Sequence, residues 1–347
     1  MSSPTPSPPR ALMRAVVQDA YGSPDALALQ EISVPTPGDG EVLVRVRAAS
    51  LHPDVWHVVT GRPYVLRIMG SGLRRPKNPV PGTDLAGVVE SVGAGATRFR
   101  PGDEVFGEIV RVNQWRNAGA YAEYAAVPES LLEPKPAGVT FEEAAAVPTS
   151  ALIALRLLRD EGRVKAGQTV LVNGAGGGVG VFAVQIAKAL GATVTAVDST
   201  EKLEMLRSIG AERVIDYMDE DFTQSGDRWD IVFDVAGNHP WSVVKRAITV
   251  DGTYVLIGHD HFGVGGKWFG SLGRFAGQLV LSPFVRQLPG LRGVKRERPE
   301  DLATVARLID TGQVRPVVGR TFPLSEVRDA IRSMSEGHTL GKIVITI

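Results

Sequence analysis

A glycine-rich loop is the part of this sequence best suited to hold a charged ligand. Residues 171–180 read LVNGAGGGVG, so a strand-like stretch runs into several glycines and then into a helical pattern. Glycines let the backbone approach a pyrophosphate, whose negative charge then lies at the positive end of the helix. Strand, glycine loop and helix in this order predict a dinucleotide site, and an ordinary tight turn is the alternative. The predicted contact residues of the loop are Gly174, Ala175, Gly177, Gly178, Val179 and Gly180.

A carboxylate stands where dinucleotide-binding proteins contact a ribose. Asp198 closes the next strand-like stretch, about 20 residues after the glycines. It is suited to accept hydrogen bonds from ribose hydroxyls and to repel a 2′-phosphate, which favours NADH. Ser199 and Lys202 follow it and are suited to hold that phosphate, which favours NADPH. Capping of the following helix by Ser199 is the structural alternative, and these residues alone leave the choice of cofactor open.

Two histidines lie close together in residues 50–64, which read SLHPDVWHVVTGRPY. A histidine titrates near neutral pH and is therefore able to pass a proton to a developing oxyanion. We predict His52, His57 and the nearby Tyr64 as the catalytic residues. The alternative is a structural role, since a single histidine in a loop is more often hydrogen-bonded within the fold than catalytic.

Metal ligands are scarce in this chain. Its 347 residues include no cysteine, which excludes disulfides, thiolate zinc sites and a cysteine nucleophile. His52, His57 and Asp84 are the one remaining set that we consider for zinc. We predict a metal-free site, because Asp84 is explained more simply as an acceptor for nearby backbone N–H groups.

The composition limits the partners that we expect. Lysine plus arginine and aspartate plus glutamate each number 38, so no net charge favours nucleic acid or an anionic membrane. No stretch approaches the ~18 uninterrupted apolar residues that cross a bilayer. Residues 1–10, MSSPTPSPPR, are rich in serine and proline and predict a disordered tail instead of a targeting signal. We expect a small-molecule substrate and a cytoplasmic location, with neither nucleic acid nor membrane as a partner.

The pattern of strand-like and helical stretches changes near the middle of the chain. A length of 347 residues predicts two domains. From residue 14 to about residue 136, short strand-like runs are broken by glycine and proline, which predicts a β-rich domain. After Pro148, strand-like and helical stretches alternate, which predicts a parallel doubly wound sheet. Residues 259–277 contain six glycines and predict a mobile connection that acts as a lid or packs at a subunit interface.

Four segments distributed over much of the chain carry a family resemblance. They are VPGTDLAGVVESVGAGATRFRPGDEVFGE (80–108), GAYAEYAAVP (119–128), FEEAAAVPTSALIAL (141–155) and VLVNGAGGGVGVFAVQIAKALGATV (170–194). In these segments the sequence resembles the medium-chain dehydrogenase/reductase superfamily, in its zinc-free quinone oxidoreductase-like branch. The resemblance implies an α/β fold, in which a GroES-like β-rich catalytic domain accompanies a Rossmann domain with a doubly wound parallel sheet.

The resemblance also implies how the chain is divided. Residues 14–147 and 299–347 are expected to form the GroES-like domain, and residues 148–298 the Rossmann domain, after a disordered tail at 1–13. Relatives often dimerise through the edges of their Rossmann sheets, so we expect a homodimer.

Further cofactor contacts follow from the resemblance. Related reductases use NADPH more often than NADH, and Tyr217 stands where they place a tyrosine beside the 2′-phosphate. Glu201, in contrast, occupies a position that is often arginine or lysine in such relatives. NADPH is therefore the predicted cofactor, with NADH as the alternative. The other implied contact residues are Val235, Ala236, Ile257, Gly258 and Lys342.

The resemblance bears on the metal and on the reaction. Zinc-containing relatives have a ligand cysteine where this chain has Leu51, and a His-Glu pair where it has Thr83 and Asp84. Without a Lewis acid, the best hydride acceptors delocalise the incoming charge themselves, as quinones and enones do. We predict a zinc-independent, NAD(P)H-dependent oxidoreductase that transfers hydride to a quinone, an enone or a related activated carbonyl compound. The alternatives are a zinc-type alcohol dehydrogenase with a His/His/Asp site and a non-catalytic, dinucleotide-binding structural or sensor protein.

Overall fold

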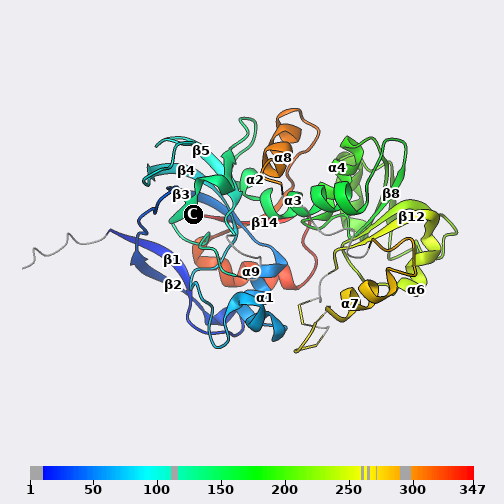
Figure 1. Cartoon of the computed structure of the whole chain (residues 1–347), viewed down its shortest axis with the longest axis horizontal. Coiled ribbons are helices and arrows are strands. Elements are labelled where there is room, and N and C mark those ends of the chain that lie inside the picture. Colours follow the sequence, from blue (N-terminus) through cyan, green and yellow to red (C-terminus); the bar gives the residue numbers. More distant parts are fainter. Residues whose placement is uncertain (1–10, 111–115, 259–261, 264–265, 271, 290–297) are drawn as a thin grey trace, which may run out of the picture.

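Two lobes lie side by side in the molecule, one rich in strands and the other layered from strands and helices (Figure 1). The computed structural model describes residues 11–110, 116–258, 262–263, 266–270, 272–289 and 298–347. Most of the tail that we predict over residues 1–13 lies outside the described residues. Strand β1 begins at Leu12, however, so the last two residues of the predicted tail belong to a strand.

The β-rich lobe is built on a seven-stranded sheet with the order β13-β14-β3-β4-β5-β7, in which β6 also pairs with β3. A separate antiparallel pair, β1 (Leu12–Gln18) and β2 (Leu27–Ser33), packs beside it. Strand β14 runs antiparallel to β3 with Val344 opposite Ser50, so distant parts of the chain share one sheet. The seven strands are β3 (Glu41–Ser50), β4 (Asp84–Val92), β5 (Glu104–Glu108), β6 (Tyr124–Pro128), β7 (Leu132–Pro134), β13 (Val318–Pro323) and β14 (Lys342–Thr346).

The second lobe contains a five-stranded sheet with the order β10-β9-β8-β11-β12, and every pairing in it is parallel. The strand order reverses between β8 and β11, and in such sheets the crevice at the carboxyl ends of these two strands is the usual ligand site. The α/β fold class that the sequence predicts is thereby confirmed. The strands are β8 (Thr169–Asn173), β9 (Thr193–Asp198), β10 (Arg213–Asp216), β11 (Trp229–Asp234) and β12 (Ile248–Leu256).

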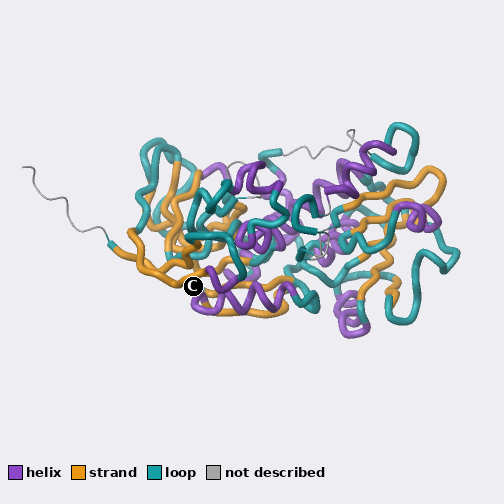
Figure 2. Tube along the Cα trace, turned by 90° about the horizontal axis from the view of Figure 1, so that it is seen from below, coloured by secondary structure: helices purple, strands orange, loops and turns teal. Residues whose placement is uncertain are grey.

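Helices cover the parallel sheet and fill much of the space between the two groups of strands (Figure 2). The segment 259–277, which we predict as a loop, is partly helical because α7 begins at Leu272. Residues 259–261, 264–265 and 271 of that segment lie outside the described part of the chain. The helices of this lobe are α4 (Gly180–Ala189), α5 (Leu203–Ser208), α6 (Trp241–Val244) and α7 (Leu272–Leu281).

One hydrophobic core extends across both lobes. Phe106 and Val344 of the β-rich lobe belong to the same buried cluster as Val172 and Phe182 of the second lobe. Between them lie α2 (Phe141–Ala145), α3 (Pro148–Arg156) and α8 (Asp301–Asp310), and α8 packs on α3. Buried Asp301 accepts from Arg156 Nε at 2.7 Å and from Arg159 at 2.5 Å, which fixes α8 in place.

Helix α1 (Pro53–Thr60) begins directly after His52 and contains His57, two of the predicted catalytic residues. Pro53 occupies its first position, and Gly61 ends it with a left-handed φ of 61°. Its apolar residues are buried, and α9 (Val327–Ser335) packs against it. These contacts fix both ends of the helix and hold the histidines at the junction of the lobes.

Candidate active site

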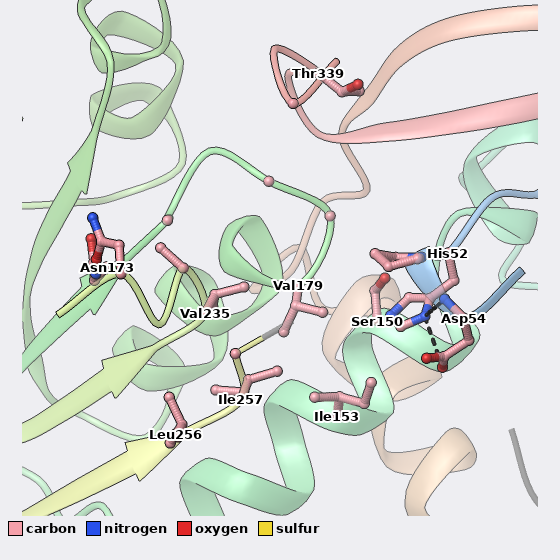
Figure 3. Close-up of a pocket in the computed structure, with 18 of the residues that line it drawn as sticks. His52, Asp54, Ser150, Ile153, Asn173, Val179, Val235, Leu256, Ile257 and Thr339 are labelled. Atoms are coloured by element: carbon pink, nitrogen blue, oxygen red, sulfur yellow. Dashed lines mark hydrogen bonds and ion pairs between the residues drawn. The ribbon is translucent and has the colours of Figure 1, made fainter. Parts of the chain in front are cut away.

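A cavity of about 1140 Å³ lies between the two lobes, at the carboxyl ends of β8 and β11. We call it the cleft. Figure 3 shows side chains from both lobes pointing into it, with Val179, Val235 and Ile257 opposite His52 and Ser150. Most of the residues that the sequence singles out line this one space. They are His52, His57, Gly174, Gly177, Gly178, Val179, Asp198, Ser199, Lys202, Tyr217, Val235, Ala236, Ile257, Gly258 and Lys342.

The glycine loop owes its shape to positions where a side chain would not fit. A Cβ atom on Gly180 would lie 2.2 Å from the carbonyl oxygen of Gly174, and one on Gly178 would lie 2.8 Å from Cδ of Lys342. A Cβ atom on Gly177, in contrast, would make only an ordinary contact, 3.6 Å from the carbonyl oxygen of Gly174. Ala175 and Gly180 are buried and, unlike the other predicted loop residues, are not among the residues that line the cleft.

Asp198 is held by its neighbours before any ligand arrives. Its Oδ2 accepts from the backbone N–H of Gly176 at 2.7 Å, and its Oδ1 accepts from that of Ser199 at 2.9 Å. Lys202 Nζ lies 3.1 Å from Oδ1, and both side chains are 7% exposed. The positive charge of Lys202 therefore balances the carboxylate that the sequence marks as a ribose contact. Gly176, which the sequence reasoning omits, is the glycine that ties Asp198 to the loop.

The outer end of the cleft is formed by polar groups around Asp198. Tyr217 is 53% exposed and lines the cleft, and its backbone N–H donates to the carbonyl of Asp198. Ser199 also lines it, and its hydroxyl lies 3.2 Å from Oε1 of Glu201. This end therefore presents an exposed phenol, beside a hydroxyl that Glu201 engages and an ammonium group that Asp198 engages.

Asp234 organises the ends of the central strands. It is fully buried and accepts from Asn173 Nδ2 at 2.8 Å, from the N–H of Gly237 at 2.8 Å and from the hydroxyl of Tyr254 at 2.7 Å. Burial raises the pKa of this carboxyl group, and the hydrogen bonds oppose that effect. The backbone that follows is thereby fixed, which places Val235 and Ala236 in the cleft wall.

His52 and Asp54 form a pair on the opposite wall (Figure 3). Nδ1 of His52 lies 3.0 Å from Oδ2 of Asp54 and 3.4 Å from the backbone nitrogen of the same residue. The shorter contact assigns the Nδ1 proton to the bond with the carboxylate, so Nε2 is the ring nitrogen left for a ligand. Both side chains are mostly buried and both line the cleft. A histidine oriented by a carboxylate is an arrangement suited to proton transfer.

The other two predicted catalytic residues differ from His52. His57 lines the cleft, but its Nδ1 makes a 2.7 Å hydrogen bond with the carbonyl of Arg62, and its ring is buried beside Trp56. Tyr64 does not line the cleft. It lies behind α1, edge-on to the ring of Trp268, because the chain turns away after Gly61. We therefore withdraw Tyr64 from the candidate catalytic residues.

A threonine hydroxyl bridges two carboxyl groups next to the cleft. Oγ1 of Thr149 lies 2.5 Å from Oδ1 of Asp84 and 3.1 Å from Oε1 of Glu108. A hydroxyl has one proton to donate, so both contacts are satisfied only when one carboxyl group is protonated and donates to Thr149. Burial raises the pKa of both carboxyl groups, and burial together with the Asp84 carboxylate raises that of Glu108 to about 7, so the pair readily keeps one shared proton. Asp84 also accepts from the backbone N–H of Thr149, as the sequence predicts.

Lys342 joins this buried network to the cleft. Its Nζ donates to the carbonyl of Leu51 at 2.5 Å, and the side chain is 2% exposed. Burial lowers the pKa of its ammonium group, while the carboxylates of Asp84, Asp54 and Glu108 oppose that shift. A buried cation thus lies between the glycine loop and the histidine wall.

A buried hydroxyl in the cleft wall has no partner in the described part of the chain. Oγ of Ser150 makes no hydrogen bond there, although the residue is fully buried. It lies 3.5 Å from the Cβ position of Gly178 and lines the cleft. Buried polar groups are almost always hydrogen-bonded, so this hydroxyl is suited to a polar ligand group beside the glycine loop. No sequence motif marks Ser150 or Asn173 as a cleft residue.

Comparisons with known proteins agree with this geometry. A family model described as "Alcohol dehydrogenase GroES-like domain" matches residues 38–137, and one described as "Zinc-binding dehydrogenase" matches residues 209–345. The chain is 33% identical to the "Chloroplast envelope quinone oxidoreductase homolog" of Arabidopsis thaliana, over 96% of this chain and 98% of the relative. It is 34% identical to the "NADPH-dependent alkenal/one oxidoreductase, chloroplastic" of the same plant, over 96% of this chain and 79% of the relative.

A solved structure has the same architecture. The quinone oxidoreductase from Coxiella burnetii superposes with a TM-score of 0.80 at 26% identity, over 97% of this chain and all of the other. The chain belongs to the medium-chain dehydrogenase/reductase superfamily. Within that superfamily it falls in the quinone oxidoreductase-like branch, as the sequence predicts.

Members of this superfamily raise the question of zinc, because one matching family model is named for it. Among the described residues, no three histidine, aspartate or glutamate side chains gather closely enough to share a metal ion. Leu51 supplies no donor atom, and Asp84 is occupied by Ser50 and Thr149. The described residues at these positions therefore do not fit a zinc site, whereas the glycine loop, Asp198 and Ser150 fit a nicotinamide dinucleotide. In the described ranges no helix is long and apolar enough to cross a membrane.

Proposed function

We propose that this protein reduces quinones or enones with a nicotinamide cofactor and without zinc. The observation that carries the proposal is the meeting, in one cleft, of a glycine loop suited to a dinucleotide with the His52–Asp54 pair. The relatives named for quinone and for alkenal/one reduction support this substrate class. A small hydrophobic acceptor suits the apolar wall that Ile153, Val179 and Ile257 provide.

The residues of the cleft divide the chemistry between its two walls. A reduced nicotinamide supplies a hydride when it is bound. The glycine loop holds and orients the ligand on one wall, and the hydroxyl of Ser150 faces the loop from the opposite wall. On the other, Asp54 stabilises the protonated ring of His52 and leaves its Nε2 proton free to reach the oxygen of a reduced acceptor. The buried ammonium of Lys342 adds positive charge where the oxyanion develops.

The acceptor class follows from the donor set. A simple ketone needs a Lewis acid or several strong donors to stabilise an alkoxide. A quinone or an enone spreads the incoming charge over a conjugated system and needs fewer donors. His52, Lys342 and Ser150 are the donors that we assign to the reacting end of the cleft, and the absence of a Lewis acid among them favours conjugated acceptors over simple ketones.

We propose NADPH as the preferred cofactor. Lys202 neutralises Asp198, so the carboxylate that would repel a 2′-phosphate carries little net charge. Ser199 and Tyr217 lie at the same end of the cleft and are suited to donate to phosphate oxygens. NADH remains the alternative cofactor, and a comparison of the two cofactors separates these choices.

Stopped-flow oxidation of NADPH and of NADH tests the whole proposal. The acceptors are a benzoquinone, a naphthoquinone, an alkyl enone and a simple ketone, each measured with and without a chelator. We expect rapid oxidation of NADPH with the conjugated acceptors, slow oxidation with the ketone, and no effect of the chelator. If both cofactors bind and neither is oxidised, the protein is not this reductase. Loss of activity with the chelator would refute zinc independence.

The cytoplasmic location, the homodimer and the domain boundaries stay predictions from the sequence. Cell fractionation and sedimentation measure the first two directly.

A further inference from the structure

A second cavity lies behind α1, and its nine lining residues are all distinct from those of the cleft. Its volume is about 340 Å³. The walls come from α1, from the segment after it and from the turn that follows β1. The lining residues are Tyr21, Gly22, Ser23, Pro24, Trp56, Thr60, Arg62, Tyr64 and Arg67.

The charged side chains that line this second cavity are all positive. Arg62 and Arg67 contribute two guanidinium groups, and none of the nine lining residues is acidic. Asp25 is the neighbouring acid in sequence, and its carboxylate is already engaged by the hydroxyl of Ser23 and by Arg332. The guanidinium of Arg62 has no hydrogen-bond or ion-pair partner within the described part of the chain. The cavity therefore carries an uncompensated positive charge.

Arg67 is held in a geometry that leaves one edge of its guanidinium available. Its Cζ lies 4.4 Å from the ring centroid of Tyr21 and 4.7 Å from that of Tyr64. Its Nε donates to the carbonyl of Gly61 at 2.8 Å. Aromatic rings satisfy the faces of a guanidinium, so the Nη atoms remain for a ligand, and these atoms bind carboxylates in a bidentate fashion.

The backbone is shaped to permit this packing. Gly61 ends α1 with a φ of 61°, which favours glycine, and a Cβ atom there would lie 2.6 Å from both Arg67 Nε and Tyr21 Cδ1. The hydroxyl of Tyr21 donates to the carbonyl of Gly72 at 2.6 Å, which fixes the ring that covers Arg67. The second cavity thus places two cations among aromatic walls, and these contacts hold Arg67 in position.

We propose that the second cavity is a binding site for a small organic carboxylate that carries a flat ring. The carboxylate binds Arg62 and the Nη edge of Arg67, and the ring packs among Tyr21, Trp56 and Tyr64. The volume equals about ten water molecules at ~30 Å³ each, which suits one ring and one carboxylate. This site is independent of the reductase function proposed for the cleft.

Isothermal titration of the full chain with benzoate and with benzamide tests the site. Benzamide has the shape of benzoate without its charge, and saturating NADP⁺ occupies the dinucleotide part of the cleft. We expect benzoate to bind at least about tenfold more tightly than benzamide. Arg62→Ala should weaken benzoate binding by about tenfold or more, while Arg74→Ala, which removes an exposed arginine of the same segment, should not change it.

A second variant guards against a folding defect. Arg67→Lys keeps the charge but removes the bidentate edge, so it should also weaken benzoate binding, and NADP⁺ affinity reports whether each variant is folded. Absence of benzoate binding to the natural sequence, equal binding of benzoate and benzamide, or undiminished binding by Arg62→Ala would each overturn the proposal. Because Arg62 does not line the cleft, a failure here leaves the reductase proposal untouched.

Discussion

The two walls of the cleft are built by different means. The wall in the parallel sheet consists of backbone and strand ends, with the glycine loop and Asp198 set by a pattern of neighbouring residues. The histidine wall depends on side chains that meet from distant parts of the chain, such as Lys342 at Leu51. The wall in the parallel sheet is therefore predictable from local sequence. The histidine wall depends on the completed fold. Each of the following experiments tests one wall against the other.

The largest effect is expected at His52. Replacement by glutamine, His52→Gln, removes the transferable proton of the imidazole ring and should lower kcat with a benzoquinone by about 10²–10⁴-fold, with NADPH affinity unchanged. His57→Gln is the matched control and should lower kcat much less, because the ring of His57 is tied to Arg62. Equal losses in the two variants would show that His52 has no special part.

On the opposite wall, Gly177→Val should abolish cofactor binding without unfolding the protein. The Cβ position of Gly177 is open, its nearest atom lying 3.6 Å away, so a valine fits the fold and occupies the ligand's space. We expect NADPH affinity to fall about thousandfold, equivalent to about 4 kcal/mol, with little change in Tm. Gly138→Ala, at an open position far from the loop in sequence, is the control. Tight NADPH binding by the valine variant would refute the loop's role.

The acid pair behind the histidine wall predicts how stability depends on pH. The pKa of Glu108 is raised to about 7 in the folded protein, from an ordinary value of 4.5. The folded state therefore keeps a proton that the unfolded chain loses. The contribution of Glu108 to the free energy of unfolding is fully present below pH 4.5 and is lost as the pH rises through 7. This difference is worth about 3 kcal/mol.

Glu108→Gln removes that dependence. Its free energy of unfolding should exceed that of the natural sequence at pH 8 by more than at pH 5, measured by urea titration at both values. Glu31→Gln, at an exposed position, is the control and should behave like the natural sequence. A difference between Glu108→Gln and the natural sequence that does not vary with pH would contradict the shared proton.

The smallest effect is expected for cofactor choice. Lys202→Met leaves Asp198 without its balancing charge, so kcat/KM with NADPH should fall by about tenfold relative to that with NADH. Lys165→Met, at an exposed lysine, is the control. An unchanged ratio of the two cofactors would mean that Lys202 serves only to hold Asp198.

The sequence predicts the fold class and most of the dinucleotide wall, because glycine spacing and strand–helix alternation are local signals. It does not predict that Asp54 orients His52, because the contact between the two side chains depends on where α1 begins. Ser150 carries no pattern at all, since its importance lies in being buried without a partner. The sequence also places Tyr64 in the cleft, because it does not show that the turn after Gly61 directs the chain behind α1.

The pairing of β14 with β3 has a consequence for biosynthesis. Strand β3 is made early, yet one of its edges is completed only when residues 342–346 have left the ribosome. Strand β6 covers residues 41–45 of that edge earlier, but residues 48–50 stay open until then and can pair with another nascent chain. Lys342 arrives with the same strand, so the cleft is assembled late in synthesis. A chaperone that shields β3 during this interval should therefore raise the yield of active protein more than it raises its final stability.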